Sequence, residues 1–244
     1  MRLDLALVER HLVESREDAK KAIDSGSVLV NNILVTKKTK EVKPEDAITI
    51  SWEKKYVSRG GEKLEGILYY YFEDKEAVIN YLISKNALDI GSSTGGFTDF
   101  LLKHGISHVT CIDVGNNQLH STLRTNPKIS LFEDTDIRSF SDSRHSYDII
   151  VADLSFIPLK KVVDDIARLS QSGTLCFLLI KPQFEVGKGN LKKGILKNEA
   201  LLEPLFLDYR TLFEDKGFIE IDIQPCSIKG GDGNQEYFLV CKKA

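Results

Sequence analysis

Four charged side chains stand where apolar segments meet loops, and together they could perform acid–base chemistry. Asp153 ends the run DIIVAD, Lys181 ends LCFLLIK, and Glu236 opens the last apolar run, EYFLV. The fourth, Lys63, lies earlier in the chain, in SRGGEKL. Ligands of open α/β sheets bind at the carboxyl ends of the strands, and two ammonium and two carboxylate groups are tolerated in a partly dry site when they pair. We therefore expect these four residues to form one catalytic cluster.

A lysine amine is the candidate general base of this cluster. A free lysine has a pKa of about 10.4 and is mostly protonated at neutral pH, but desolvation and a second ammonium both lower that value. We expect Lys181 to remove a proton from a substrate hydroxyl, with Lys63 depressing its pKa. Asp153 and Glu236 would orient the base. Any one of the four could be a solvated strand end; the four together fit that reading poorly.

The stretch LDIGSSTGGF, residues 88–97, reads as a strand, a glycine turn and the start of a helix, which is typical of a nucleotide-like ligand site. A dinucleotide fingerprint needs a glycine at its middle position, where this chain has Ser93. Asp89 should lie at the mouth of the pocket, where a carboxylate repels a pyrophosphate but suits an ammonium and a sulfonium. The turn therefore favours S-adenosylmethionine over NAD as the cofactor.

Two further carboxylates follow the next strands. Asp113 ends CIDV and fits a carboxylate bonded to a ribose diol, a device that dinucleotide sites also use. Asp136 follows the third strand, near the expected place of an adenine amino group. Helix capping and solvation explain each acid singly, but not their repeated placement at strand ends. The expected donor-binding residues are Asp89, Gly91, Ser92, Ser93, Thr94, Gly95, Gly96, Phe97, Asp113, Asp136 and Asp153.

Alternating strands and helices must position these residues. From about Ser58 onward, apolar runs such as ALDIG, HVTCIDV and YDIIVADL alternate with helical segments, which indicates a parallel sheet covered on both faces. The last two expected strands, FIEIDIQPC and EYFLVCKK, are joined by a loop without a helix, so the final strand should run antiparallel. The predicted fold class is α/β, a Rossmann-like class I methyltransferase sheet.

The first fifty or so residues read differently. Two short helical segments come first, the second capped by Ser15, and β-rich runs around the turn Asn31–Asn32 follow. This pattern predicts a small α+β domain over residues 1–55. A linker over 56–60 and the sheet domain over 61–244 would complete the chain.

Composition narrows the possible functions. With 244 residues and 42% hydrophobic content, the chain can build one sizeable core and a small extra domain. The net charge is only -3, so any nucleic-acid surface must come from local clusters of basic residues. The four cysteines show no metal-ligand spacing, and we expect buried thiols and no metal site. Without a signal-peptide core or a membrane-length apolar run, we expect a cytoplasmic protein that does not bind membranes.

Five motifs follow one another along the chain: YVSRGGEKL, GSSTGGFTDFLL, VADLSFIPL, LLIKPQFEVGKG and GGDGNQEYFLV. They resemble those of the TlyA family, proteins historically labelled hemolysin A that combine an S4 domain with an FtsJ-like ribose methyltransferase domain. Residues 2–32 are similar to the S4 RNA-binding module, with Asn-Asn where that module often has Asn-Gly. The resemblance covers essentially the whole chain, and it implies an α+β S4-like domain followed by the methyltransferase.

The resemblance also implies an activity. It places a Lys-Asp-Lys-Glu tetrad on the four residues already named, with S-adenosylmethionine as methyl donor. The acceptor would be the ribose 2′-hydroxyl of a cytidine in ribosomal RNA. The family has a shorter type that modifies large-subunit rRNA and a longer type that modifies both subunits; this chain looks like the shorter type.

Two basic segments flank the expected site and could bind RNA phosphates. Residues 54–63 hold four basic side chains against one acid, and residues 181–197 hold five against one. In the small domain, basic residues recur on one side of the second helix. Solvated charge is the usual alternative for such runs. The expected contacts to ribosomal RNA or a ribosomal subunit are Arg16, Lys20, Lys21, Arg59, Lys188, Lys192 and Lys193.

Three other functions fit the sequence less well. A pore-forming hemolysin needs an amphipathic or apolar membrane element, and none is visible. A non-catalytic ribosome-binding or assembly factor on a methyltransferase fold has no need for the tetrad and the glycine turn. An NAD-linked oxidoreductase is disfavoured by Ser93 and by the acids around the pocket.

Overall fold

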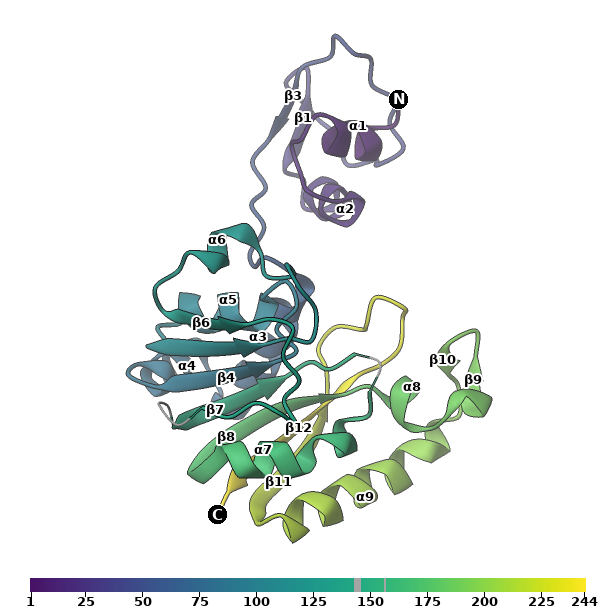
Figure 1. Ribbon diagram of the computed structural model, residues 1–244. Helices are drawn as coiled ribbons and strands as arrows, with labels where there is room; N and C mark the ends of the chain where they lie inside the picture. Colours follow the sequence, from purple (N-terminus) through teal and green to yellow (C-terminus); the bar gives the residue numbers. More distant parts are fainter. Residues whose placement is uncertain (143–145, 156) are drawn as a thin grey trace. The chain divides into compact units, whose positions relative to one another are not determined.

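The computed structural model describes residues 1–142, 146–155 and 157–244, and Figure 1 shows its helices and strands. The chain forms two compact units, Met1–Lys55 and Tyr56–Ala244. No helix in the described part of the chain is both long enough and apolar enough to cross a membrane.

The first unit is a small α+β domain with a core of its own. Ser15 begins the second helix because its hydroxyl accepts a hydrogen bond from the backbone N–H of Asp18 at 3.1 Å. Asn31 and Asn32 both have positive φ angles, 52° and 63°, as a two-residue hairpin turn requires. The strands form the antiparallel order β2-β1-β3. The elements are α1 (Leu3–Glu9), α2 (Arg16–Asp24), β1 (Val28–Val30), β2 (Ile33–Leu34) and β3 (Ile48–Ile50).

The second unit is built on a seven-stranded sheet with the order β11-β12-β8-β7-β4-β5-β6. Strands β6, β5, β4, β7 and β8 pair in parallel, whereas β12 runs antiparallel to both β8 and β11. The expected α/β class with a reversed last strand is thus confirmed. The strands are β4 (Asn86–Ile90), β5 (His108–Ile112), β6 (Ile129–Phe132), β7 (Tyr147–Ala152), β8 (Ser170–Ile180), β11 (Phe218–Pro225) and β12 (Tyr237–Lys243).

Helices cover both faces of this sheet (Figure 1). Alternate residues of β7 show it: Ile149 and Val151 pack in the core with α3, α4 and α5, while Ile150 and Ala152 pack with α7 and α9. The helices are α3 (Arg59–Phe72), α4 (Lys75–Leu82), α5 (Gly96–Lys103), α6 (Ser121–Arg124), α7 (Val163–Leu169), α8 (Pro182–Glu185) and α9 (Leu202–Asp215), with single 3₁₀ turns η1 (Leu159–Lys161), η2 (Lys188–Asn190) and η3 (Glu199–Leu201).

Two features differ from the sequence expectation or add to it. Residues 56–60, expected as a linker, lie within the second unit: Tyr56 is 3% exposed in its core, and α3 begins at Arg59. A two-stranded hairpin, β9 (Leu191–Lys192) and β10 (Ile195–Leu196), follows η2. Its turn residues, Lys193 and Gly194, have φ angles of 54° and 79°.

Candidate active site

The glycine turn joins β4 to α5, and its glycines are needed for close packing within the protein. Gly91 has a φ angle of 76°, and a Cβ there would lie 2.9 Å from the carbonyl oxygen of Asp153. A Cβ on Gly96 would lie 2.9 Å from the backbone nitrogen of Gly61, at the first turn of α3. The turn therefore brings α3 and α5 together at the point where the ligand site begins.

A cavity of about 130 Å³ lies at this turn and at the carboxyl ends of β7 and β8. The expected residues Gly95, Asp113 and Asp136 are absent from the described part of its wall. The wall consists of Ser58, Gly60, Asp89, Gly91, Ser92, Ser93, Thr94, Gly96, Phe97, Asp153, Ser155 and Lys181.

Asp89 forms the floor of the cavity, whereas we expected it at the mouth. It is 1% exposed, and its Oδ2 accepts hydrogen bonds from the backbone N–H and the hydroxyl of Thr98, at 3.1 and 2.6 Å. Burial raises the pKa of Asp89 to about 7, against the opposing effect of the Thr98 hydrogen bonds. Its Oδ1 is buried and accepts no hydrogen bond from any described residue, so one carboxylate oxygen remains for a cationic ligand group.

Asp113 and Asp136 each have a protein partner. The carboxylate of Asp113 accepts hydrogen bonds from the backbone N–H groups of Ser93 and Gly115, both at 2.7 Å, and so ties the end of β5 to the glycine turn. Asp136 pairs with Arg138 through two nitrogens, and these hydrogen bonds lower the pKa of Asp136 to about 2. An adenine contact at Asp136 therefore requires sharing this carboxylate with Arg138.

The four residues of the expected tetrad lie in one chain of ion pairs. Lys63 Nζ lies 2.7 Å from Glu236 Oε2 and 3.4 Å from Asp153 Oδ2. On the other side of Asp153, Lys181 Nζ lies 2.5 Å from Oδ1. Asp153 thus bridges the two lysines, and their alternation of charge lets the cluster remain mostly buried.

Strand direction explains this convergence. Asp153 follows β7 and Lys181 follows β8, which are parallel neighbours. Because β12 runs the opposite way, its first residue, Tyr237, pairs with Ile180, and this places Glu236 at the same edge. Lys63 reaches the edge from the first turns of α3.

Burial and charge act on Lys63 in opposite directions. The side chain of Lys63 is 8% exposed, and that of Glu236 is 4% exposed. Desolvation lowers the pKa of Lys63, but the attraction of Asp153 and Glu236 outweighs it and raises the pKa above its usual range. Lys63 is therefore held as an ammonium ion.

Sequence reasoning did not single out Ser155, Ser58 and Gly60. Ser155 Oγ accepts a hydrogen bond of 3.0 Å from Lys181 Nζ, so this lysine contacts a carboxylate and a hydroxyl. Ser58 and Gly60 bring the start of α3 to the cavity wall. All three stand in the motifs VADLSFIPL and YVSRGGEKL, which were the available signal.

The expected RNA-binding residues of the second unit lie in different places. Lys192 and Lys193 are exposed on the β9–β10 hairpin. Arg59 is half-buried at the start of α3, where its guanidinium lies against Gly231. The side chain of Lys188 is outside the described part of the structure.

In the first unit, Arg16, Lys20 and Lys21 all lie on α2. Arg16 pairs with Asp4 at 3.4 Å, Lys20 is exposed and Lys21 is half-buried. Arg16 and Lys20 line a shallow cavity together with Arg2, Lys38 and two acids, Asp4 and Glu17. Basic side chains outnumber acids around this cavity.

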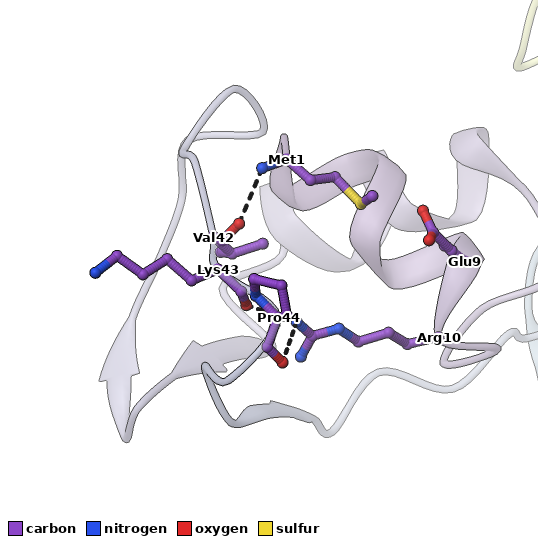
Figure 2. A pocket seen from close by; sticks show the side chains of 6 residues that line it. All are labelled: Met1, Glu9, Arg10, Val42, Lys43 and Pro44. Atoms are coloured by element: carbon purple, nitrogen blue, oxygen red, sulfur yellow. Dashed lines mark hydrogen bonds between the residues drawn. The ribbon is translucent and has the colours of Figure 1, made fainter.

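Figure 2 shows a second cavity of the first unit, about 250 Å³ in volume, lined by Met1, Glu9, Arg10, Val42, Lys43 and Pro44. The guanidinium of Arg10 donates hydrogen bonds to the carbonyl oxygens of Lys43, Pro44 and Asp46, at 2.7, 3.1 and 2.6 Å. These bonds close the loop 43–46 against α1, so Arg10 has a structural role there.

Neither a metal centre nor a disulfide is seen in the part of the chain that the structure describes. Its histidine, cysteine and acidic side chains form no cluster of three or more that could hold a metal ion. All four cysteines are buried free thiols.

The strand order and the cavity at the glycine turn define a class I methyltransferase, a fold whose members use S-adenosylmethionine. The magnesium protoporphyrin IX methyltransferase of Synechocystis PCC 6803, solved with bound SAH, shares this fold, with a TM-score of 0.52 and 15% identity over 78% of this chain and 86% of that one. Residues 56–243 match the FtsJ-like methyltransferase family, and residues 1–48 match the S4 domain. The chain belongs to the TlyA, or hemolysin A, family of FtsJ-like methyltransferases.

Full-length relatives support this assignment. The 23S rRNA (cytidine-2′-O)-methyltransferase TlyA of Campylobacter jejuni is 39% identical over 98% of both chains. Hemolysin A of Brachyspira hyodysenteriae is 38% identical over 97% of this chain and 98% of its own, and the 16S/23S rRNA (cytidine-2′-O)-methyltransferase TlyA of Mycobacterium tuberculosis is 34% identical over 98% and 88%. A solved hemolysin structure from Streptococcus thermophilus superimposes with a TM-score of 0.73 at 30% identity, covering 100% of this chain and 88% of that one. The expected family and cofactor are confirmed.

Proposed function

We propose that this protein methylates the 2′-hydroxyl of a cytidine in ribosomal RNA, and that large-subunit 23S rRNA is its substrate. The observation that carries the proposal is the ion-pair chain Glu236–Lys63–Asp153–Lys181 beside the cavity of the glycine turn. The names of the Campylobacter and Mycobacterium relatives supply the substrate class and the position of methylation.

The residues around the cavity fit the methyl donor. S-Adenosylmethionine supplies a methyl group on a sulfonium when it is bound. The free carboxylate oxygen of Asp89 fits its ammonium group, and the carboxylate of Asp113 fits its ribose diol. Phe97 and the backbone of Gly91 would border the donor, because both line the cavity.

Lys181 acts as the base in this proposal. Its amine contacts Asp153 Oδ1 and Ser155 Oγ, which fix its position at the cavity wall. The amine would take the proton of the ribose hydroxyl, whose oxygen gains the methyl group as the carbon–sulfur bond of the donor breaks and the donor leaves as a thioether. Lys63, itself paired with Glu236, holds Asp153 in place from the opposite side.

The RNA would be held by basic side chains at sites outside the cavity. In the second unit, phosphates would be contacted by Lys192 and Lys193, which are exposed on the hairpin, and by Arg59, which is half-buried at the start of α3. Arg16, Lys20 and Lys21 of the S4 domain would supply further contacts, and S4 recognition would use shape more than sequence.

Mapping of ribose methylation tests the proposal. Purified protein is incubated with labelled donor and with 23S rRNA, 16S rRNA or whole subunits, and modified riboses are located by resistance to alkaline hydrolysis. A single modified cytidine in 23S rRNA is expected. Modification in both rRNAs would assign the activity to both subunits, and donor-independent rRNA binding without transfer would identify a non-catalytic assembly factor instead.

A further inference from the structure

We propose that Asn234 is a positioning residue that joins the basic β9–β10 hairpin to the loop before Glu236. RNA bound by the hairpin is thereby held in a fixed position relative to the proposed tetrad. This inference rests on the proposed function. Asn234 stands two residues before Glu236 and is 2% exposed, which is unusual burial for an asparagine.

The side chain of Asn234 bridges the two segments by a pair of opposed hydrogen bonds. Its Nδ2 donates to the carbonyl oxygen of Gly194 at 2.9 Å, and its Oδ1 accepts from the backbone N–H of Leu196 at 3.0 Å. Gly194 is in the hairpin turn and Leu196 ends β10. An asparagine amide supplies one donor and one acceptor in this geometry, and a side chain without both groups cannot replace it.

The loop before Glu236 is itself closed and tied to the segment that follows Lys181. Asp232 accepts hydrogen bonds from the backbone N–H and the Nδ2 of Asn234, at 3.0 and 2.7 Å. It also accepts one of 3.3 Å from Gln183, which stands two residues after Lys181. At the start of the loop, a Cβ on Gly230 would lie 2.7 Å from Glu236 Oε1, so the loop folds directly over the catalytic carboxylate.

The hairpin depends on this attachment. Its strands contain two residues each, and a hairpin of two pairs is at best marginally stable alone. Leu191, Ile195 and Leu196 are only half-buried. Lys192 and Lys193 are exposed, and loss of the Asn234 bonds would release both from a fixed position relative to Glu236.

A double-mutant cycle on rRNA binding tests the inference. Asn234→Ala is expected to weaken rRNA binding and raise the KM for rRNA about tenfold, with a shallower salt dependence and an unchanged donor Kd. Lys192→Ala/Lys193→Ala should show the same pattern. In the Asn234→Ala background, removal of the two lysines should add less than about twofold, because a detached hairpin no longer presents them to RNA.

Independent effects would overturn the inference. If the losses from Asn234→Ala and from the lysine pair multiply, or if Asn234→Ala leaves the KM and salt slope unchanged, Asn234 does not act through the hairpin. Asn190→Ala is the matched control: Asn190 is an exposed asparagine of the same segment whose side chain donates to the nearby carbonyl oxygen of Val186, and this variant should bind RNA as the wild type does.

Two safeguards keep the result interpretable. Donor titration and thermal melting establish that each variant is folded. Where Asn234→Ala does not fold, Asn234→Asp replaces it, since it keeps the acceptor for Leu196 and loses the donor for Gly194. Absence of methyl transfer by the wild type would overturn the proposed function. The double-mutant cycle measures rRNA binding and does not depend on turnover, so it would still test the role of Asn234.

Discussion

Lys181 is the side chain on which the proposed chemistry depends, and its replacement gives the clearest result. Lys181→Ala is expected to lower kcat about 10³-fold, since general base catalysis contributes on the order of 10²–10⁴. The donor Kd should change little, because Asp89 and Asp113 are untouched. Transfer of a labelled methyl group to rRNA and calorimetric donor titration provide the measurements. Turnover within about tenfold of the wild type would remove the assignment of Lys181 as the base.

Asp89 should make donor binding depend on pH. Burial raises its pKa to about 7, so the carboxyl group is neutral in the free protein below that pH and ionises above it. Donor affinity should therefore increase from pH 6 to pH 8. Asp89→Asn should bind donor more weakly and with a flat pH profile over this range. An equally steep profile in the variant would assign the titration to another group.

The raised pKa of Asp89 also makes the free energy of unfolding depend on pH. The folded pKa of Asp89 lies above the unfolded value of 3.8, so the folded state holds a proton that the unfolded state has lost. This group therefore lowers the free energy of unfolding as pH rises from about 4 to about 7, and its effect is constant above that window. Asp89→Asn should remove this contribution in urea unfolding at pH 5 and pH 8.

The pKa shift of Lys63 has the same sign and acts in a higher pH window, and the residue also has a structural role. Its folded pKa is raised, so the stability it contributes is present below about pH 10.4 and is lost as pH rises through the folded value. Lys63→Ala leaves the buried carboxylate of Glu236 without its partner and should cost about 3 kcal/mol or more in the free energy of unfolding. Glu236→Gln in the same background should restore part of that loss. If Lys63→Ala and the double variant Lys63→Ala/Glu236→Gln have the same free energy of unfolding in urea, a buried Lys63–Glu236 ion pair is contradicted.

At the scale of elements, the contact between α3 and α5 depends on the absence of a side chain at Gly96. A Cβ there would meet the backbone of Gly60 and Gly61, at 3.0 and 2.9 Å, and backbone cannot move aside cheaply. Gly96→Ala should therefore lower the free energy of unfolding by about 1–3 kcal/mol, as overpacking does. Gly189→Ala is the control, because no atom lies within 4 Å of a Cβ at that position. Similar melting temperatures for both variants would refute this account.

Strand logic made the main elements and the tetrad predictable from sequence. Apolar runs alternating with helices define a parallel sheet, and a helix-free connection reverses the last strand, which brings Glu236 to the edge that holds Asp153 and Lys181. Both predictions use only the direction of each strand and the pattern of apolar and helical segments along the chain.

Features set by packing between distant segments were not predictable in this way. The sequence does not show that a hydrogen bond from Thr98 holds Asp89 in the floor of the cavity. Nor does it show that a side chain at Gly96 would clash with the backbone of α3. The β9–β10 hairpin was missed because its strands are too short to show an alternating pattern. Its attachment point, Asn234, lies forty residues from Gly194.

At the scale of the whole molecule, the positive charge available to RNA lies in a few local patches. The net charge of -3 gives no general attraction to RNA, so affinity must come from patches. Lys192→Ala/Lys193→Ala should weaken rRNA binding and reduce the magnitude of the slope of log K against log salt by about 1.4 to 1.8, since each phosphate contact contributes about 0.7–0.9. Lys75→Ala, at an exposed lysine of α4 outside the basic segments, should leave the slope unchanged. An unaltered slope in the double variant would assign the hairpin lysines to solvation.

The reversed strand β12 has a consequence for how activity is acquired. Its insertion between β8 and β11 means that the sheet is completed by a strand that follows all the other strands of the sheet in the chain. A chain interrupted before residue 236 would leave the edge of β8 open and Lys63 without its nearest counter-ion. The proposed tetrad is therefore incomplete in any copy of the chain cut before residue 236, and we expect such a copy to transfer no methyl group.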